Sequence, residues 1–202
     1  MRRLILEEWL TLDGFAADRD GGLGFFPAAD TDHLSDRDQL AFLDSVDTIL
    51  LGRRTYELFV DFWPDATSDE QIVADRLNAL PKMVFSNTLG SAPWGKPGRW
   101  PAAEVVRGDA VTAVQELKRR SGKHIVLWGS LTLAQALITA NLIDEYRFHL
   151  CPTILGGGRA LFPELRMPSN LERKSARTYD TGVVFLHYEL RREAVAQPLP
   201  ND

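Results

Sequence analysis

The sequence predicts a mixed α/β protein in which helices flank a central sheet. Short apolar runs of strand character alternate with stretches of helical periodicity over the first three quarters of the chain. Two further strand-like runs close the chain, and the turn signal Asp180-Thr181-Gly182 joins them as an antiparallel hairpin. Parallel strands with helical crossovers, followed by a hairpin, therefore define the expected class.

The predicted strands are short apolar runs, several of them ended by glycine or polar turn residues. We expect strands over residues 3–10, 48–51, 82–86, 104–107, 124–128, 143–151, 171–179 and 183–191. A long loop containing Asp13-Gly14 and the glycine-rich segment 20–24 follows the first strand. Loops of this kind often carry functional residues.

The predicted helices have apolar residues at helical spacing between polar ends. We expect helices over residues 35–46, 53–62, 70–78, 110–120 and 131–140. Ser35 or Asp36 is placed to cap the first helix. The fourth is the clearest, because Asp109 can cap it, basic residues fill its last turn and Gly122 follows.

Composition favours a protein that acts on small molecules. The 202 residues, 45% of them hydrophobic, suit a single domain over residues 1–192 with a frayed tail at 193–202. A net charge of −5 disfavours nucleic acids and anionic membranes as partners. One cysteine, no HExxH motif and a first apolar run that stops at Glu7-Glu8 predict a cytoplasmic protein without a metal site.

Two strand-glycine-helix junctions, residues 50–55 and 126–132, are candidate phosphate-binding turns. Glycine lets a ligand approach the backbone, and the following helix start favours negative charge. The alternative is that Gly52 and Gly129 only end their strands and that Ser130 only caps a helix. The ordinary Rossmann fingerprint GxGxxG is absent.

Two other segments have open interpretations. Ser86-Asn87-Thr88 follows a strand and can bind a ribose or its 2′-phosphate, or form an ordinary polar turn. Gly156-Gly157-Gly158-Arg159 can cover a ligand or simply reverse the chain.

The order and spacing of these segments resemble the dihydrofolate-reductase-like superfamily, in particular the reductase domain of bifunctional riboflavin-biosynthesis proteins. The matching segments are residues 12–16, 50–57, 83–88, 126–130, 142–145 and 152–162, and the resemblance runs from about residue 2 to 192. It implies a three-layer fold with an eight-stranded, mainly parallel sheet. It also implies a homodimeric, NADPH-dependent reductase.

The resemblance further implies which residues form the site. Those matching the dinucleotide-binding positions are Gly52, Arg53, Thr55, Ser86, Gly129, Ser130, Leu131 and Thr132. Those on the substrate side are Asp13, Asp61 and Trp128, with Trp128 where the riboflavin reductases have glutamate. Asn87 stands where an arginine is often found, which leaves NADH possible. No catalytic residue is assigned.

The best-specified activity implied is reduction of 5-amino-6-(5-phosphoribosylamino)uracil with NADPH. Hydride would pass to an imine-like carbon, and the protein would mainly align the reactants and exclude water. A dihydrofolate reductase is the rival enzyme. A non-catalytic, dinucleotide-binding regulatory protein and a structural dimer without cofactor are the alternatives of other classes.

Overall fold

The computed structural model describes residues 1–27, 33–164 and 169–191, and centres on an eight-stranded sheet. The strand order is β5-β4-β3-β6-β1-β7-β10-β9. The strands are β1 (Leu4–Thr11), β3 (Val46–Gly52), β4 (Lys82–Phe85), β5 (Glu104–Val106), β6 (His124–Trp128), β7 (Glu145–Cys151), β9 (Leu171–Thr178) and β10 (Val184–Leu190). Neighbours from β5 to β7 are parallel, whereas β10 is antiparallel to both β7 and β9. The tail predicted at 193–202 lies outside the described residues.

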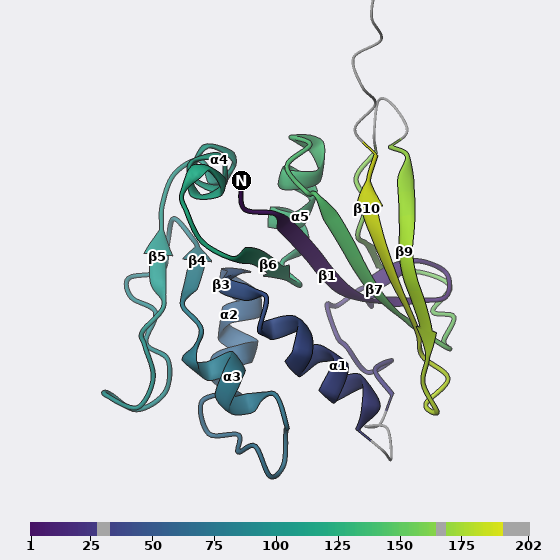
Figure 1. Ribbon diagram of the computed structural model, residues 1–202, viewed down its shortest axis with the longest axis horizontal. Helices are drawn as coiled ribbons and strands as arrows, with labels where there is room; N and C mark the ends of the chain where they lie inside the picture. The colour runs from purple at the N-terminus through teal and green to yellow at the C-terminus, as the bar shows by residue number, and fades with distance from the viewer. Residues whose placement is uncertain (28–32, 165–168, 192–202) are drawn as a thin grey trace, which may run out of the picture.

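Helices cover both faces of this sheet, which makes three layers (Figure 1). One face carries α4 (Ala110–Arg119) and α5 (Leu131–Thr139), whose apolar side chains pack with those of β1 and β6. The other face carries α1 (Leu34–Leu43), α2 (Arg53–Val60) and α3 (Ala74–Ala79) over a second apolar cluster. The predicted class, a mainly parallel mixed sheet between helices with a closing hairpin, is confirmed. No helix in the described ranges is long and apolar enough to span a bilayer.

Most predicted elements occur within a few residues of their expected ends. The cap at Asp109 is confirmed, since its carboxylate accepts the backbone N–H of Thr112 at 2.9 Å. Val46 was expected at the end of a helix but begins β3, where it pairs with His124. The helix expected over 70–78 is limited to α3, because turns occupy the residues before Ala74.

The expected cap of α1 is wrong. The helix begins at Leu34, after His33, which is in the left-handed conformation and makes no capping bond with its side chain. Asp36 instead lies in the first turn, 3.3 Å from Nδ1 of His33. A carboxylate in the first turn still interacts favourably with the positive end of the helix dipole. Asp36 therefore stabilises the same helix start from a different position.

A second, two-stranded sheet was not predicted. It pairs β2 (Phe15–Ala17) with β8 (Arg159–Ala160) in antiparallel fashion. A Cβ added at Gly158 would lie 2.3 Å from the carbonyl oxygen of Ala17, so only glycine permits this close approach. The glycine-rich loop before Arg159 is therefore held against the loop that follows β1.

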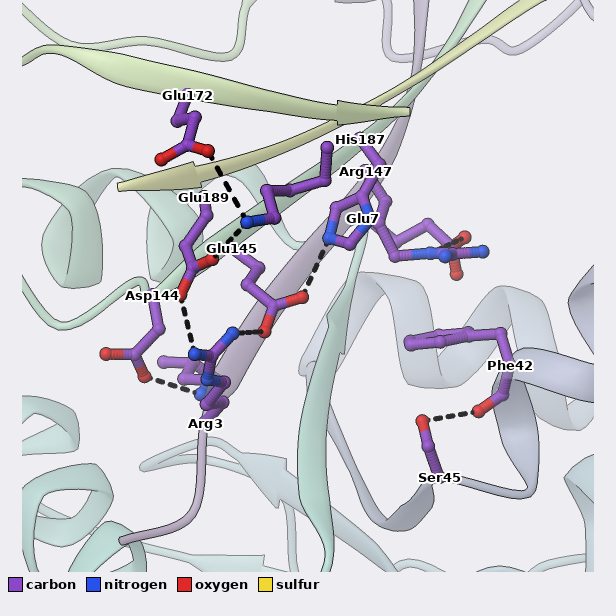
Figure 2. A network of polar contacts seen from close by, with 12 residues as sticks. Arg3, Glu7, Phe42, Ser45, Asp144, Glu145, Arg147, Glu172, His187 and Glu189 are labelled. Atoms are coloured by element: carbon purple, nitrogen blue, oxygen red, sulfur yellow. Dashed lines mark hydrogen bonds and ion pairs between the residues drawn. The ribbon is translucent and has the colours of Figure 1, made fainter. Parts of the chain in front are cut away.

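The hairpin end of the sheet is stabilised by ion pairs (Figure 2). Arg3 binds Glu145 and Glu189 through separate guanidinium nitrogens, each at 2.6 Å. His187 Nε2 lies 2.7 Å from the other oxygen of Glu145. These contacts join β10 to β7 and to Arg3, the residue before β1. The cleft described next lies at the carboxyl ends of β3, β4 and β6 and along β1.

Candidate functional site

A cleft of about 1220 Å³ is lined by residues at the carboxyl ends of β3, β4 and β6 and along β1. Ligands of open α/β sheets generally bind at this edge. The volume exceeds the roughly 300–1,000 Å³ of an ordinary small-molecule pocket. The cleft therefore has room for a large extended ligand beside a smaller one.

The two glycine turns predicted from sequence form one unit at this cleft. The N–H of Gly52 donates to Oγ of Ser130 at 2.6 Å. In return, the N–H of Ser130 donates to Oγ1 of Thr55 at 3.0 Å. The Ser130 side chain makes no helix-capping bond, so the alternative that it only caps α5 does not hold.

Glycine is required at position 129 by conformation and by space. Gly129 has φ 52°, and the next residue, Ser130, is also left-handed at φ 62°. A Cβ on Gly129 would lie 3.1 Å from Oγ1 and 3.2 Å from Cγ2 of Thr55. A side chain at this position would therefore press on Thr55 at the start of α2, which glycine avoids.

The amino ends of α2 and α5 both open on the cleft beside these turns. Helix amino ends offer unpaired N–H groups and a positive dipole to anions. Arg53, at the start of α2, adds a charge on a side chain that is 48% exposed, with Nη1 3.3 Å from Oγ1 of Thr88. The Ser86 hydroxyl accepts the N–H of Leu89 at 3.0 Å, so Ser86 holds the turn after β4 as well as lining the cleft.

The structure brings together all eight residues predicted for the dinucleotide. Gly52, Arg53, Thr55, Ser86, Gly129, Ser130, Leu131 and Thr132 each line the cleft. Of the three predicted substrate-side residues, Trp128 lines it, whereas Asp13 and Asp61 do not. Asp61 is exposed at the carboxyl end of α2.

Asp13 holds a loop. Its carboxylate accepts the N–H of Gly156 at 2.8 Å and that of Leu155 at 3.2 Å. The hydroxyl of Thr11 donates to it at 2.7 Å and, with these N–H groups, lowers the pKa of Asp13. Asp13 thereby fixes the glycine-rich loop next to β8.

The part of the cleft next to Trp128 contains a buried carboxylate that sequence reasoning missed. Glu7 of β1 is 4% exposed, and its oxygens accept Nε1–H of Trp128 at 2.7 Å, an N–H of Gln39 at 2.7 Å and Nε–H of Arg147 at 2.9 Å. Nε2 of His149 lies 3.3 Å away. Burial alone would raise the pKa of Glu7, but Arg147, His149 and Trp128 together lower it below its ordinary value.

Aromatic rings pack on two of the residues that contact this carboxylate, Arg147 and His149. Figure 2 shows the Arg147 guanidinium beside the Phe42 ring. It lies 3.8 Å from the centre of that ring and 4.6 Å from the centre of the Phe185 ring. The Trp9 ring stacks on His149 with centroids 4.5 Å apart and on Phe26 at 5.0 Å. Of these residues, Trp9, Phe26 and His149 line the cleft, and stacked rings of this kind are suited to a planar heterocycle.

Three polar atoms on residues lining the cleft are buried and have no hydrogen-bond partner among the described residues. They are Oε2 of Glu8, Oε1 of Gln39 and Nδ1 of His149. Unsatisfied buried groups are rare in folded proteins and are frequent at functional sites. The sequence signal was the pair Glu7-Glu8 inside an apolar strand, which sequence reasoning took only as a break in hydrophobicity.

A central sheet between two layers of helices, with a cleft in this place, defines a protein of the dihydrofolate-reductase-like fold. A putative riboflavin biosynthesis protein from Shewanella sp. PV-4 has a similar structure, with a TM-score of 0.74 and 24% identity over 94% of this chain and 99% of that one. Dihydrofolate reductase from Enterococcus faecalis, complexed with NADP(H), has a TM-score of 0.58 and 14% identity, and covers 94% and 97% of the two chains.

Sequence comparison identifies the family of the chain. Residues 2–185 match the model of the RibD C-terminal domain, and the chain belongs to this family. A Bacillus subtilis protein named "Uncharacterized protein YyaP" is 30% identical over 189 residues, which are 93% of this chain and 94% of that protein. The family resemblance predicted from the ordered segments is therefore confirmed.

Proposed function

We propose that the protein is an NADPH-dependent reductase of a small heterocycle, of the kind that reduces 5-amino-6-(5-phosphoribosylamino)uracil in riboflavin biosynthesis. The observation that carries this is the interlocked pair of glycine turns at the starts of α2 and α5, facing one cleft. Membership of the RibD C-terminal domain family supports a riboflavin-type reductase. We place its action in the cytoplasm and residues 1–192 in one domain.

The residues present fit a dinucleotide. Backbone N–H groups at the starts of α2 and α5, with the Ser130 and Thr132 hydroxyls nearby, suit its phosphates, and the close approach at Gly129 keeps side chains out of the way. Arg53 and Ser86 suit the 2′-phosphate or ribose. When bound, the cofactor supplies a hydride. The chain's own part is to bind, to orient the substrate and to exclude water.

On the substrate side we propose Trp128 as a direct contact. Glu7 fixes its indole through the 2.7 Å bond to Nε1, so the ring has one orientation. We propose that Asp13 contributes by holding the loop at 155–156 and that Asp61 contributes from the end of α2. Dihydrofolate reduction is the rival activity. Steady-state oxidation of NADPH with the aminouracil and with dihydrofolate separates the two, and NADPH binding without turnover of either would favour a regulatory protein.

Cofactor preference is tested by thermal shift with NADPH and with NADH. NADPH at 100 times its Kd stabilises the protein by about 2.7 kcal/mol, which raises the melting temperature. Arg53→Ala is expected to reduce this shift more with NADPH than with NADH, because it removes a cation suited to the 2′-phosphate. Arg119→Ala, on the exposed last turn of α4, is the matched control and should change neither shift. An equal loss for both cofactors would refute the 2′-phosphate role.

We also propose that the protein is a homodimer. Leu186 and Tyr188 of β10 are half-buried residues near the end of the sheet. They pack against the apolar cluster on the face that carries α4 and α5. A second chain covering this part would bury them. Light scattering is expected to give twice the monomer mass, and Leu186→Arg is expected to lower it, since a charge is costly in an apolar interface. A monomeric mass for the wild type would overturn the proposal.

A further inference from the structure

Glu8 is a buried acid in the cleft wall, and none of the described residues forms an ion pair with it. The residue is 6% exposed and lines the cleft. Its Oε1 accepts the N–H of Trp9 at 3.1 Å, while Oε2 has no partner among the described residues. The adjacent Glu7 is the opposite case, because four neighbouring groups satisfy it.

The position of Glu8 follows from the sheet. Successive side chains of a strand point to opposite faces, so Glu8 lies with Leu6 and Leu10 on the α4–α5 face, away from the polar cluster of Glu7. The last pair between β1 and β6 joins Glu7 and Trp128, whereas β1 continues along β7 to Thr11. Glu8 is thus the first residue of β1 beyond the end of β6, next to the turn at Gly129.

These surroundings keep the carboxyl protonated. Burial raises the pKa of Glu8 to about 8, the Trp9 N–H opposes this shift and the charge of Glu7 adds to it. The other charged or titratable side chains lining the cleft are Asp36, Arg53, Arg54, His149 and Arg159. A neutral acid whose second oxygen carries a proton, with no acceptor for it among the described residues, is equipped to donate that proton.

We propose that Glu8 is the proton donor of the reduction, an inference that rests on the proposed reductase function. Glu8 would give the proton of Oε2–H to the nitrogen of the substrate's C=N bond, and a bound NADPH would supply the hydride for the carbon. The products would be CH–NH and a Glu8 carboxylate. The carboxylate regains its proton from water before the next turnover. Glu8 would then touch the substrate directly, from the side of the cleft opposite the Glu7 cluster.

The test compares Glu8→Gln with the wild type. Glutamine keeps the size and the acceptor for the Trp9 N–H but cannot give up a proton, so kcat is expected to fall roughly 10²–10⁴-fold. NADPH affinity is expected to stay unchanged. Glu8→Asp keeps the acid and should retain part of the activity, and Glu116→Gln, exposed on α4, is the matched control.

The pH profile adds a readout that a structural role would not move. The donor must be protonated, so wild-type kcat should hold below the Glu8 pKa of about 8 and fall about tenfold per pH unit above it. The residual activity of Glu8→Gln should lack this alkaline decline. The same alkaline decline of kcat in the wild type and in Glu8→Gln would overturn the proposal.

A titration without substrate or cofactor completes the test. The ¹³C carboxyl resonance that disappears in Glu8→Gln is expected to titrate near pH 8 in the free protein, and titration near the ordinary glutamate value would overturn the proposal. If the wild type oxidises NADPH and Glu8→Gln matches it, the donor role fails alone. If the wild type binds no NADPH, the proposed function fails, and the donor role fails with it.

Discussion

Gly129→Ala is expected to weaken NADPH binding at least about tenfold, equivalent to about 1.4 kcal/mol. The added methyl group would meet Thr55 at 3.1 Å and push the turn away from α2. The bond from the Ser130 N–H to Thr55, which sets the shape of the cradle, would lengthen or break. The positive φ of 52° adds roughly 1–2 kcal/mol of backbone strain. Isothermal titration with NADPH and chemical denaturation measure the two effects.

Gly98→Ala separates strain from contact. Gly98 also has a positive φ, 81°, but a Cβ there meets no atom within 4 Å, and the residue does not line the cleft. This variant should lose stability to a similar extent and bind NADPH like the wild type. If both variants bound NADPH equally well, the close packing of the turn on Thr55 would have no role in the cradle.

Glu7→Gln is expected to lower the free energy of unfolding by about 3–5 kcal/mol, because it leaves the buried Arg147 charge without its partner. Nε of Arg147 lies 2.9 Å from Glu7, and that arginine side chain is only 11% exposed. Substrate binding should weaken as well, since glutamine offers one acceptor oxygen in place of two, and its NH2 group then faces either Arg147 or the donors of Trp128 and Gln39. Urea denaturation at neutral pH measures the stability change.

The pH dependence of this effect has a definite sign. The folded-state pKa of Glu7 lies below its unfolded value of 4.5, so its contribution is present above pH 4.5 and is lost as the pH falls through the folded value. The difference between wild type and Glu7→Gln should therefore shrink in acid. Adding Arg147→Met removes the stranded charge and should restore part of the loss. If the second substitution cost its full share again, the pair would not be coupled.

Much of the fold could be predicted because its signals are local. Asp109 and the basic last turn mark both ends of α4, and the apolar run 124–128 gives the bounds of β6 without error. The pairing of β2 with β8 could not be predicted, since each strand is two or three residues long and its partner is distant in sequence. Only the fold shows that Gly158 permits this contact.

The site was predictable to a similar degree. Glycine followed by a helix start is a pattern within a few residues, so both glycine turns at the cleft were found, although the bond from Gly52 to Ser130 spans 78 positions. The polar cluster was not found, because Glu7, Gln39 and His149 belong to three separate elements. A carboxylate in an apolar strand shows that a partner exists, but the sheet register decides which partner it has.

The hydroxyl of Ser130, which belongs to the Gly129 turn, accepts the N–H of Gly52 in the other glycine turn. This link limits which substitutions the two turns can accept. A change at the Gly52 turn also moves Thr55, whose hydroxyl accepts the Ser130 N–H in the Gly129 turn. We therefore expect the two glycine turns to change together or not at all. The side-chain bonds of Glu7 to Gln39, Trp128 and Arg147 involve neither Ser130 nor Thr55, and the Ser130 hydroxyl donates to the backbone carbonyl of Trp128, which side-chain substitution leaves in place. Substitutions there can redirect the enzyme to a different heterocycle while the nucleotide half stays intact. We expect altered substrate range to be reached by far fewer changes than altered cofactor use.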